Sequence, residues 1–375
     1  MKTAFFQSFE DSSDREETPF RLSMVQAELK KNSLSGYLVP RSDVHQGEYV
    51  AACDERLSWL TGFTGSAGIC VVGEDRAGIF VDGRYSIQAR KQTKSPFEVI
   101  QWDKKNFFHW IEKNIVKGKI GFDPWLHSHK EIFSLSEEFA NSGISFAPSD
   151  NLIEKVWMNR PAKTSNKVMK YPVELAGLSA REKCQKIAEK IRFRKANSAV
   201  ITLPDSIAWL LNLRGNDVIH NPILHAFLII DSGGYVKIFS RNQSLINCIS
   251  NLKDFVKVYP VENFETTLAE LTGSVLMDET TAPFAVVKIL QANGSEPIMG
   301  EDPIILPKAC KNPVELRHAR ICHKRDAVHM CEFLSWLDTQ NENEFDEIDV
   351  VIELENFRRK DKNLKEISFD TIAAS

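Results

Sequence analysis

The segment that decides the fold runs from Leu38 to Ala89. It contains Leu38-Val39-Pro40-Arg41-Ser42-Asp43, Trp59-Leu60-Thr61-Gly62-Phe63-Thr64-Gly65-Ser66-Ala67-Gly68 and Asp82-Gly83-Arg84-Tyr85. Short apolar runs at Gly36–Pro40, Gly68–Val72 and Gly78–Asp82 predict strands. Helical patterns lie between and after such runs, an alternation that is typical of helices covering a sheet. This segment therefore predicts an α/β fold.

The same alternation extends to both sides of this segment. Apolar residues recur at helical spacing from Arg21 to Lys31. Residues 1–17 are polar and acidic, and we expect them to form a flexible tail. Beyond the segment's strands we expect helices and strands in turn, at Tyr85–Gln92, Glu98–Gln101, Lys105–Val116, Lys119–Asp123 and Lys130–Asn141.

The second half of the chain echoes the first. Ser179 and Glu182 form a capping box, which begins a helix expected to run to about Asn197. Strands follow at Ala199–Leu203, Ala226–Ile230 and Tyr235–Phe239. Glu55, Leu57, Trp59, Leu60 and Gly65 recur later as Asp205, Ile207, Trp209, Leu210 and Gly215. We interpret this as a weak internal repeat of two similarly folded domains; the alternative is that Trp-Leu is a common helix pair.

Proline-rich segments divide the chain. Pro161 and Pro172 bracket a polar linker, and a second boundary falls near Pro303 to Pro307. The expected division is a tail at 1–17, one domain at 18–162, a second at 163–307 and a remainder at 308–375. In that remainder Asn312 and Pro313 begin a helix expected to reach about Thr339, and another is expected from about Phe345 to Arg358.

Composition narrows the class of protein. The chain has 375 residues, of which 43% are hydrophobic and 26% charged, so it suits two or three globular domains. Its net charge of −4 favours neither a nucleic-acid partner nor an anionic membrane surface. No apolar run approaches the roughly 18 residues of a membrane helix. The seven cysteines are dispersed without a CxxC pair, which predicts reduced thiols and a cytoplasmic location.

Histidines offer weak candidates for a metal site. His127 and His129 would share a face of a strand, as ligands sometimes do. They precede a helix in a loop-like stretch, so a solvated or helix-capping role is expected instead. His318, His323 and His329 lie on the long helix, where we expect surface or domain contacts, because three turns separate the outer two.

Two further features carry charge. Acidic residues gather before the last helix, where the helix dipole favours them, and we expect them to be solvated: Glu342, Glu344, Asp346, Glu347 and Asp349. Arg84 lies at a strand–helix elbow, where side chains project past the sheet edge. Its guanidinium could clamp a carboxylate or a peptide carbonyl, or it could simply pair with Asp82 or another nearby acid. The spacing alone does not decide between these two roles.

Taken together, these motifs resemble the Xaa-Pro aminopeptidase (aminopeptidase P) family, which belongs to the creatinase- and prolidase-like M24 metallopeptidases. The segment from Leu38 to Ala89 resembles the family's first domain, and Leu203–Asp217 closely resembles the central motif of its second. Lys311–Glu315 and Ser368–Ile372 resemble the beginning of its catalytic domain. The resemblance covers almost all of the chain.

The resemblance implies a fold and an activity. The fold is two related creatinase-type α/β domains, each a mixed sheet flanked by helices, followed by the first helices of an incomplete α+β pita-bread domain. The activity is release of an N-terminal residue that precedes proline, by two divalent metals, commonly manganese, held in the last domain. The family's metal ligands have no counterpart in this sequence. We therefore expect no catalytic residue and no bound metal here, and a truncated chain that is inactive alone.

One functional position carries over from the family. Arg84 matches a first-domain arginine that reaches substrate in the neighbouring subunit of a homodimer. The resemblance thus implies a peptide with proline at position two as substrate, with Arg84 as a substrate-binding residue. The alternative function is a non-catalytic remnant that dimerises or binds peptide through its N-terminal domains.

Overall fold

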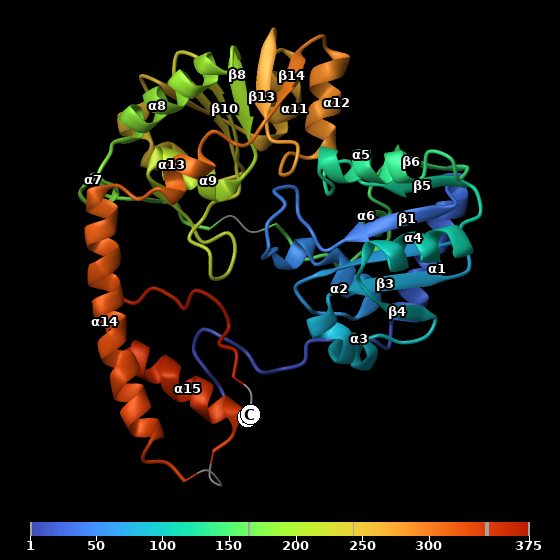
Figure 1. Cartoon of the computed structure of the whole chain (residues 1–375), viewed down its shortest axis with the longest axis horizontal. Coiled ribbons are helices and arrows are strands. Elements are labelled where there is room, and N and C mark those ends of the chain that lie inside the picture. The colour runs from blue at the N-terminus through green and yellow to red at the C-terminus, as the bar shows by residue number, and fades with distance from the viewer. Residues whose placement is uncertain (1, 164–165, 243, 342–344, 374–375) are drawn as a thin grey trace.

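The computed structural model describes residues 2–163, 166–242, 244–341 and 345–373. Its core is two six-stranded sheets, one in each half of the chain (Figure 1). The first sheet has the order β4-β3-β2-β1-β5-β6, and the second has the order β12-β11-β10-β8-β13-β14. The α/β fold class predicted from the sequence is confirmed.

The strands of each sheet are short. Those of the first are β1 (Gly36–Pro40), β2 (Gly68–Gly73), β3 (Ala77–Val81), β4 (Phe97–Gln101), β5 (Gly118–Phe122) and β6 (Ile144–Pro148). Those of the second are β8 (Ser198–Ile201), β10 (Phe227–Asp231), β11 (Val236–Phe239), β12 (Val256–Tyr259), β13 (Ser274–Met277) and β14 (Glu296–Met299). A two-stranded sheet joins β7 (Met169–Lys170) to β9 (Leu213–Arg214).

The two sheets have the same topology. In the first, β1 is antiparallel to β2 and parallel to β5. In the second, β8 is antiparallel to β10 and parallel to β13. The outer pairs correspond as well, since β3–β4, β5–β6, β11–β12 and β13–β14 are all parallel. The expected internal repeat is therefore confirmed as a repeat of strand order and direction.

Helices cover both sheets. Around the first lie α1 (Thr18–Lys31), α2 (Arg56–Thr61), α3 (Ser86–Gln92), α4 (Lys104–Asn114), α5 (His129–Glu138) and α6 (Leu152–Val156). Around the second lie α7 (Val173–Ala176), α8 (Ala180–Phe193), α9 (Pro204–Leu211), α10 (Leu245–Cys248), α11 (Phe264–Ala269), α12 (Phe284–Ala292) and α13 (Ile305–Ala309). The helix α13 continues across the boundary expected at residue 307, and the domain boundaries stay predictions.

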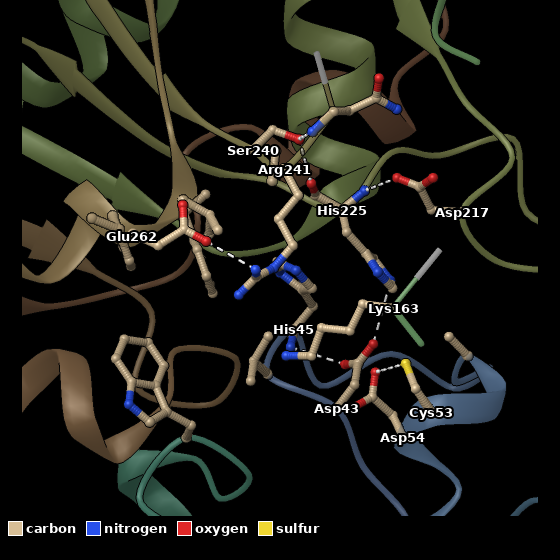
Figure 2. A pocket seen from close by; sticks show the side chains of 18 of the residues that line it. Asp43, His45, Cys53, Asp54, Lys163, Asp217, His225, Ser240, Arg241 and Glu262 are labelled. Atoms are coloured by element: carbon tan, nitrogen blue, oxygen red, sulfur yellow. Dashed lines mark hydrogen bonds and ion pairs between the residues drawn. The ribbon is translucent and has the colours of Figure 1, made fainter. Parts of the chain in front are cut away.

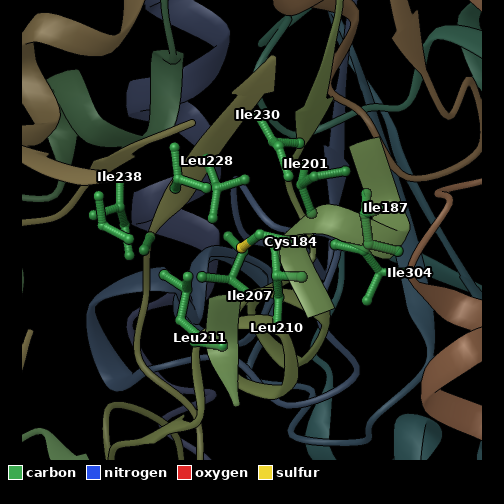
Figure 3. Close-up of a cluster of buried hydrophobic side chains, with 14 of the residues drawn as sticks. Cys184, Ile187, Ile201, Ile207, Leu210, Leu211, Leu228, Ile230, Ile238 and Ile304 are labelled. Atoms are coloured by element: carbon green, nitrogen blue, oxygen red, sulfur yellow. The ribbon is translucent and has the colours of Figure 1, made fainter. Parts of the chain in front are cut away.

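Each sheet buries both faces. Along β10, Leu228 and Ile230 contact one hydrophobic cluster, whereas Phe227 and Ile229 contact another. This alternation follows from the two-residue period of a strand. Figure 3 shows the first of these clusters, in which Ile187 of α8 and Leu210 of α9 pack against the strand. Helices on both faces of a sheet account for the continuous apolar runs in the sequence.

The remainder of the chain forms two helices away from the sheets (Figure 1). These are α14 (Pro313–Leu337), which begins with the expected capping box of Asn312 and Glu315, and α15 (Glu347–Arg358). Residues 2–17 have no helix or strand, but several of them make contacts. Gln7 accepts a hydrogen bond from the backbone of Thr371, and Ser13 donates one to the carbonyl of Gly62.

A pair of equivalent loops joins the two sheets. The loop after β5 begins at Asp123 and leads into α5, and the loop after β13 begins at Asp278 and leads into α12. Each aspartate accepts a hydrogen bond from the backbone two residues on, at 2.9 Å in the first loop and 2.8 Å in the second. The loops meet in an antiparallel bridge between Ser128 and Pro283.

Four backbone hydrogen bonds cross this contact in symmetric pairs. His129 donates to the Ala282 carbonyl (3.3 Å), and Phe284 donates to the His127 carbonyl (2.8 Å). His127 and His129 occupy the same positions after Asp123 as Ala282 and Phe284 occupy after Asp278. The second pair, equally related, joins Lys130 to Glu279 (3.0 Å) and Ala285 to Pro124 (2.9 Å). The contact therefore has approximate twofold symmetry, and we call it the loop seam.

A second contact lies beside the loop seam. His45, in the segment after β1, is buried, and its Nδ1 lies 3.0 Å from the carbonyl oxygen of Thr202, the residue after β8. The ring of His45 stacks on that of His225 at 4.8 Å. Burial, and next the nearby His225, lower the pKa of His45 from its ordinary value of 6.5 to about 4. His45 is therefore a neutral part of this contact at neutral pH.

The loop seam should be sensitive to Phe284. Its half-buried ring packs against the core of the first sheet, 5.3 Å from the ring of Phe122. We expect Phe284→Ala to lower the free energy of unfolding by about 2 kcal/mol, because apolar contact is lost and a cavity is left. Phe193→Ala, at a side chain that is 87% exposed, is the matched control and should change it little. Equal effects in urea unfolding would contradict the packing described.

His45 should make stability depend on pH. Its pKa in the folded chain lies below the unfolded value, so its contribution is complete above pH 6.5 and is lost as the pH falls toward 4. We expect this loss to reach about 3 kcal/mol. His45→Gln should flatten the dependence in unfolding measured across this range. His109→Gln, at an exposed site, should leave it unchanged; the same slope in both variants would contradict the assignment.

Candidate functional site

Arg84 lies at the edge of the first sheet, as predicted. It follows β3 within a short 3-10 turn, Gly83–Tyr85, that leads into α3. Asp82 caps this turn by accepting from the Arg84 backbone (3.0 Å), and the same oxygen accepts from Arg84 Nε at 2.8 Å. The guanidinium also lies 5.5 Å from the centre of the Tyr85 ring. The Asp82 pairing that the spacing left open is therefore present.

This pairing leaves most of the guanidinium available. The Arg84 side chain is 73% exposed, and within the described residues its Nη1 and Nη2 atoms have no hydrogen-bond partner. The hydrogen bonds from Arg84 hold the pKa of Asp82 below its usual value, so Asp82 remains a charged anchor. A guanidinium held by Nε presents its two terminal nitrogens outward, the geometry that binds a carboxylate in a fork.

A cavity of about 350 Å³ adjoins this edge. It is lined by the end of β1 and by Arg41, Asp82 and Trp102. It lies where β1 pairs with an antiparallel strand on one side and a parallel strand on the other, the kind of place where α/β sheets bind ligands. Arg41 donates to Glu55 Oε1 at 3.2 Å, yet within the described part of the chain its buried Nε lacks a partner.

A larger pocket, of about 430 Å³, lies between the two sheets. Figure 2 shows Asp43, Cys53 and Asp54 of the first sheet's loops facing His225 and Arg241 of the second, with Lys163 between them. Trp125, Phe227 and Phe264 complete an aromatic wall, on which the Phe227 and Phe264 rings stack at 4.3 Å. We call this space the interdomain pocket.

Buried ion pairs fix one side of the interdomain pocket. Arg56 is 2% exposed, and its Nη2 lies 2.8 Å from Asp54 and 2.6 Å from Glu154. Arg160 contacts the same two carboxylates. Burial alone would raise the pKa of Asp54, but the charge of Arg56 and other cations lowers it below its usual value. Asp54 therefore stays ionised and held in place.

The structure corrects one sequence prediction. The side chain of His127 is fully buried, so its expected solvated or capping role is wrong; the cap of α5 is Ser128. The His127 side chain is buried because the loop seam covers this part of the loop. His129 stacks on Phe284 at 5.9 Å, and burial lowers its pKa. Among the described residues, neither histidine belongs to a group that could hold a metal ion.

The other candidates occupy the last two helices. His329 Nδ1 lies 3.3 Å from Glu332 on the largely exposed helix α14, in keeping with a surface role. Asp346 and Asp349 form the capping box of α15, and both pair with Lys2. Glu342 and Glu344 lie outside the described residues. Among the residues that are described, no group of three or more His, Cys, Asp or Glu side chains could hold a metal ion.

No pattern in the sequence indicated the interdomain pocket. Asp43 and His225 are far apart in the sequence, and their Oδ2 and Nε2 atoms lie 3.4 Å apart in the structure. The only available signal was position, since Asp43 follows β1 and His225 precedes β10.

In the described ranges, no helix is both long enough and apolar enough to cross a membrane.

Comparison with protein families places both halves of the chain. Residues 21–158 and residues 159–315 each match a model described as the creatinase/prolidase N-terminal domain. Relatives named "Probable Xaa-Pro aminopeptidase P" from Coccidioides posadasii and Ajellomyces dermatitidis are each 34% identical to the chain over 96% of its length. The chain covers 58% and 62% of these relatives, so it spans about three-fifths of their length.

A solved structure agrees. The X-prolyl aminopeptidase from Caenorhabditis elegans, described as a cytosolic enzyme with a di-nuclear active site, superposes with a TM-score of 0.86 at 26% identity. The match covers 95% of this chain and 62% of that enzyme. With the repeated sheet topology and the two family matches, this shows that the chain belongs to the aminopeptidase P family of creatinase- and prolidase-like M24 metallopeptidases.

Proposed function

We propose that this chain functions as part of an Xaa-Pro aminopeptidase. Such an enzyme is a cytoplasmic hydrolase that releases an N-terminal residue preceding proline. The observation that carries the proposal is the 34% identity to Xaa-Pro aminopeptidase P relatives over 96% of the chain. The likeness in fold to the C. elegans enzyme supports it. Peptides with proline at position two are the proposed substrates.

The described residues do not fit a di-nuclear metal centre, because they contain no group of three or more potential ligands. We therefore assign the proposed manganese pair and the chemical step to no residue of this chain. The proposal for these residues is a supporting one, in which the two α/β units hold peptide-binding groups in place. By itself the chain is proposed to be inactive.

Arg84 is the proposed substrate contact. Its side chain is exposed and its Nε is bound to Asp82, so its two terminal nitrogens are available to a group from outside the described fold. A peptide carboxylate or carbonyl held by a neighbouring subunit of a homodimer would fit this chemistry. The pairing with Asp82 would reduce the conformational freedom lost when the peptide binds.

A second candidate is a non-catalytic protein that dimerises or binds peptide through its two α/β units. This candidate predicts that the chain binds peptide without hydrolysis, even when it is joined to a catalytic domain. The first proposal predicts hydrolysis once the chain is joined to such a domain.

A chimera would separate the two candidates. Residues 1–310 of this chain, which include all of α13, would replace the matching part of the C. elegans X-prolyl aminopeptidase. Hydrolysis of Xaa-Pro-Pro and Xaa-Ala-Pro peptides would be measured. We expect metal-dependent turnover of the proline peptide only. Arg84→Ala should lower kcat/KM by about 10- to 100-fold, because a charge-assisted hydrogen bond is lost.

Controls make this result specific. Arg90→Ala, an exposed arginine on α3, should leave kcat/KM unchanged. The unmodified chain should release no residue with or without Mn²⁺. A folded chimera without turnover would favour the second candidate, and equal losses in the two arginine variants would contradict the role of Arg84.

A further inference from the structure

The interdomain pocket contains a buried carboxylate oxygen that lacks a donor. The Asp43 side chain is only 2% exposed. Its Oδ1 accepts from the backbone of His45 at 2.9 Å and of Gly47 at 3.2 Å, whereas Oδ2 has no hydrogen-bond partner among the described residues. His225 Nε2, at 3.4 Å, is beyond the usual hydrogen-bond length. A buried acceptor without a donor is unfavourable. A pocket ligand that moves the adjacent His225 ring aside would supply that donor.

The same pocket contains a cation without a partner. Lys163 lines the pocket, and within the described ranges its ammonium makes no ion pair or hydrogen bond. Asp54 is already occupied by Arg56 and Arg160. The other cation of the pocket, Arg241, pairs with Glu262 at 2.8 Å. Lys163 is therefore free to bind an anionic group in the pocket.

An apolar surface lies between these charges and the second sheet. Phe227 and Phe264 stack, and Trp125 lies 5.9 Å from the first and 6.3 Å from the second, centre to centre. Aromatic walls with a few charged groups are typical of sites for small organic molecules. The volume of about 430 Å³ lies within the range of such sites.

We propose that the interdomain pocket binds a small zwitterion with an apolar side chain, such as a free α-amino acid. Its ammonium would donate to Asp43 Oδ2, its carboxylate would pair with Lys163, and its side chain would pack on the aromatic wall. A simple anion would instead face the pocket's carboxylates, and a metal ion would find no cluster of ligands among the described residues. This inference rests on the pocket and not on the proposed function.

Three related probes test the need for both charges. L-leucine carries both, isopentylamine lacks the carboxylate, and 4-methylpentanoate lacks the ammonium group. Binding to the whole chain would be measured by isothermal titration calorimetry at neutral pH. We expect leucine to bind with a Kd of about 1 mM or below, and each of the other probes to bind at least about 10-fold more weakly.

Two variants locate the site. Asp43→Asn keeps an oxygen for the two backbone donors but removes the charge, and it should weaken leucine binding by about 10-fold or more. Lys163→Met should weaken leucine binding similarly while leaving isopentylamine binding unchanged. Asp75→Asn and Lys105→Met, at exposed sites, are the matched controls and should bind leucine like the parent chain.

The outcomes are decisive. No heat of binding at about 10 mM leucine would overturn the proposal, as would equal affinity for the three probes. Unchanged leucine affinity in Lys163→Met would overturn it too, and this variant keeps the test valid if Asp43→Asn fails to fold. None of these measurements involves peptide hydrolysis, so their failure leaves the proposed aminopeptidase function in place.

Discussion

The structure depends on four backbone hydrogen bonds that join two equivalent loops. The first N–H groups of a helix have no partner within the helix. At the loop seam, the first donors of α5 and of α12 are satisfied by carbonyls of the opposite loop, between 2.8 and 3.3 Å. Each unit thus completes a helix end of the other. Because strand order and loop geometry are repeated, the same pair of backbone hydrogen bonds forms in both directions and joins the two halves of the chain.

This arrangement places both candidate sites. The loops after β5 and β13 meet at the loop seam, and the interdomain pocket forms beside it, between the loops after β1 and β5 and the second sheet. Arg84 lies elsewhere, after β3, on an edge that the second unit leaves open. The pocket therefore depends on how the units dock, whereas Arg84 depends only on the first sheet and on Asp82. A change that loosens the seam should affect the pocket and spare Arg84.

The sequence predicted the elements better than the contacts between them. The strand at Gly36–Pro40 was predicted at its observed bounds, because an apolar run buried on both faces stands out. The helix expected to reach Asn197 ends at Phe193, since Lys195 has a positive φ of 56° that no helix continues through. The stacking of His45 on His225 was not predictable, because it depends on docking two units. For Arg84 the sequence placed the residue and left open whether it clamps a ligand or pairs with an acid such as Asp82, and the structure shows the pairing with Asp82.

Hydrogen exchange of the intact chain would test the loop seam most directly. The amides of His129, Lys130, Phe284 and Ala285 belong to first helical turns, which exchange quickly when a helix end is free. The structure predicts that all four are protected together, to the level of the amides of β1 and β8. Exchange of these four at the rate of exposed loops, with both sheets still protected, would show that the units do not dock as described.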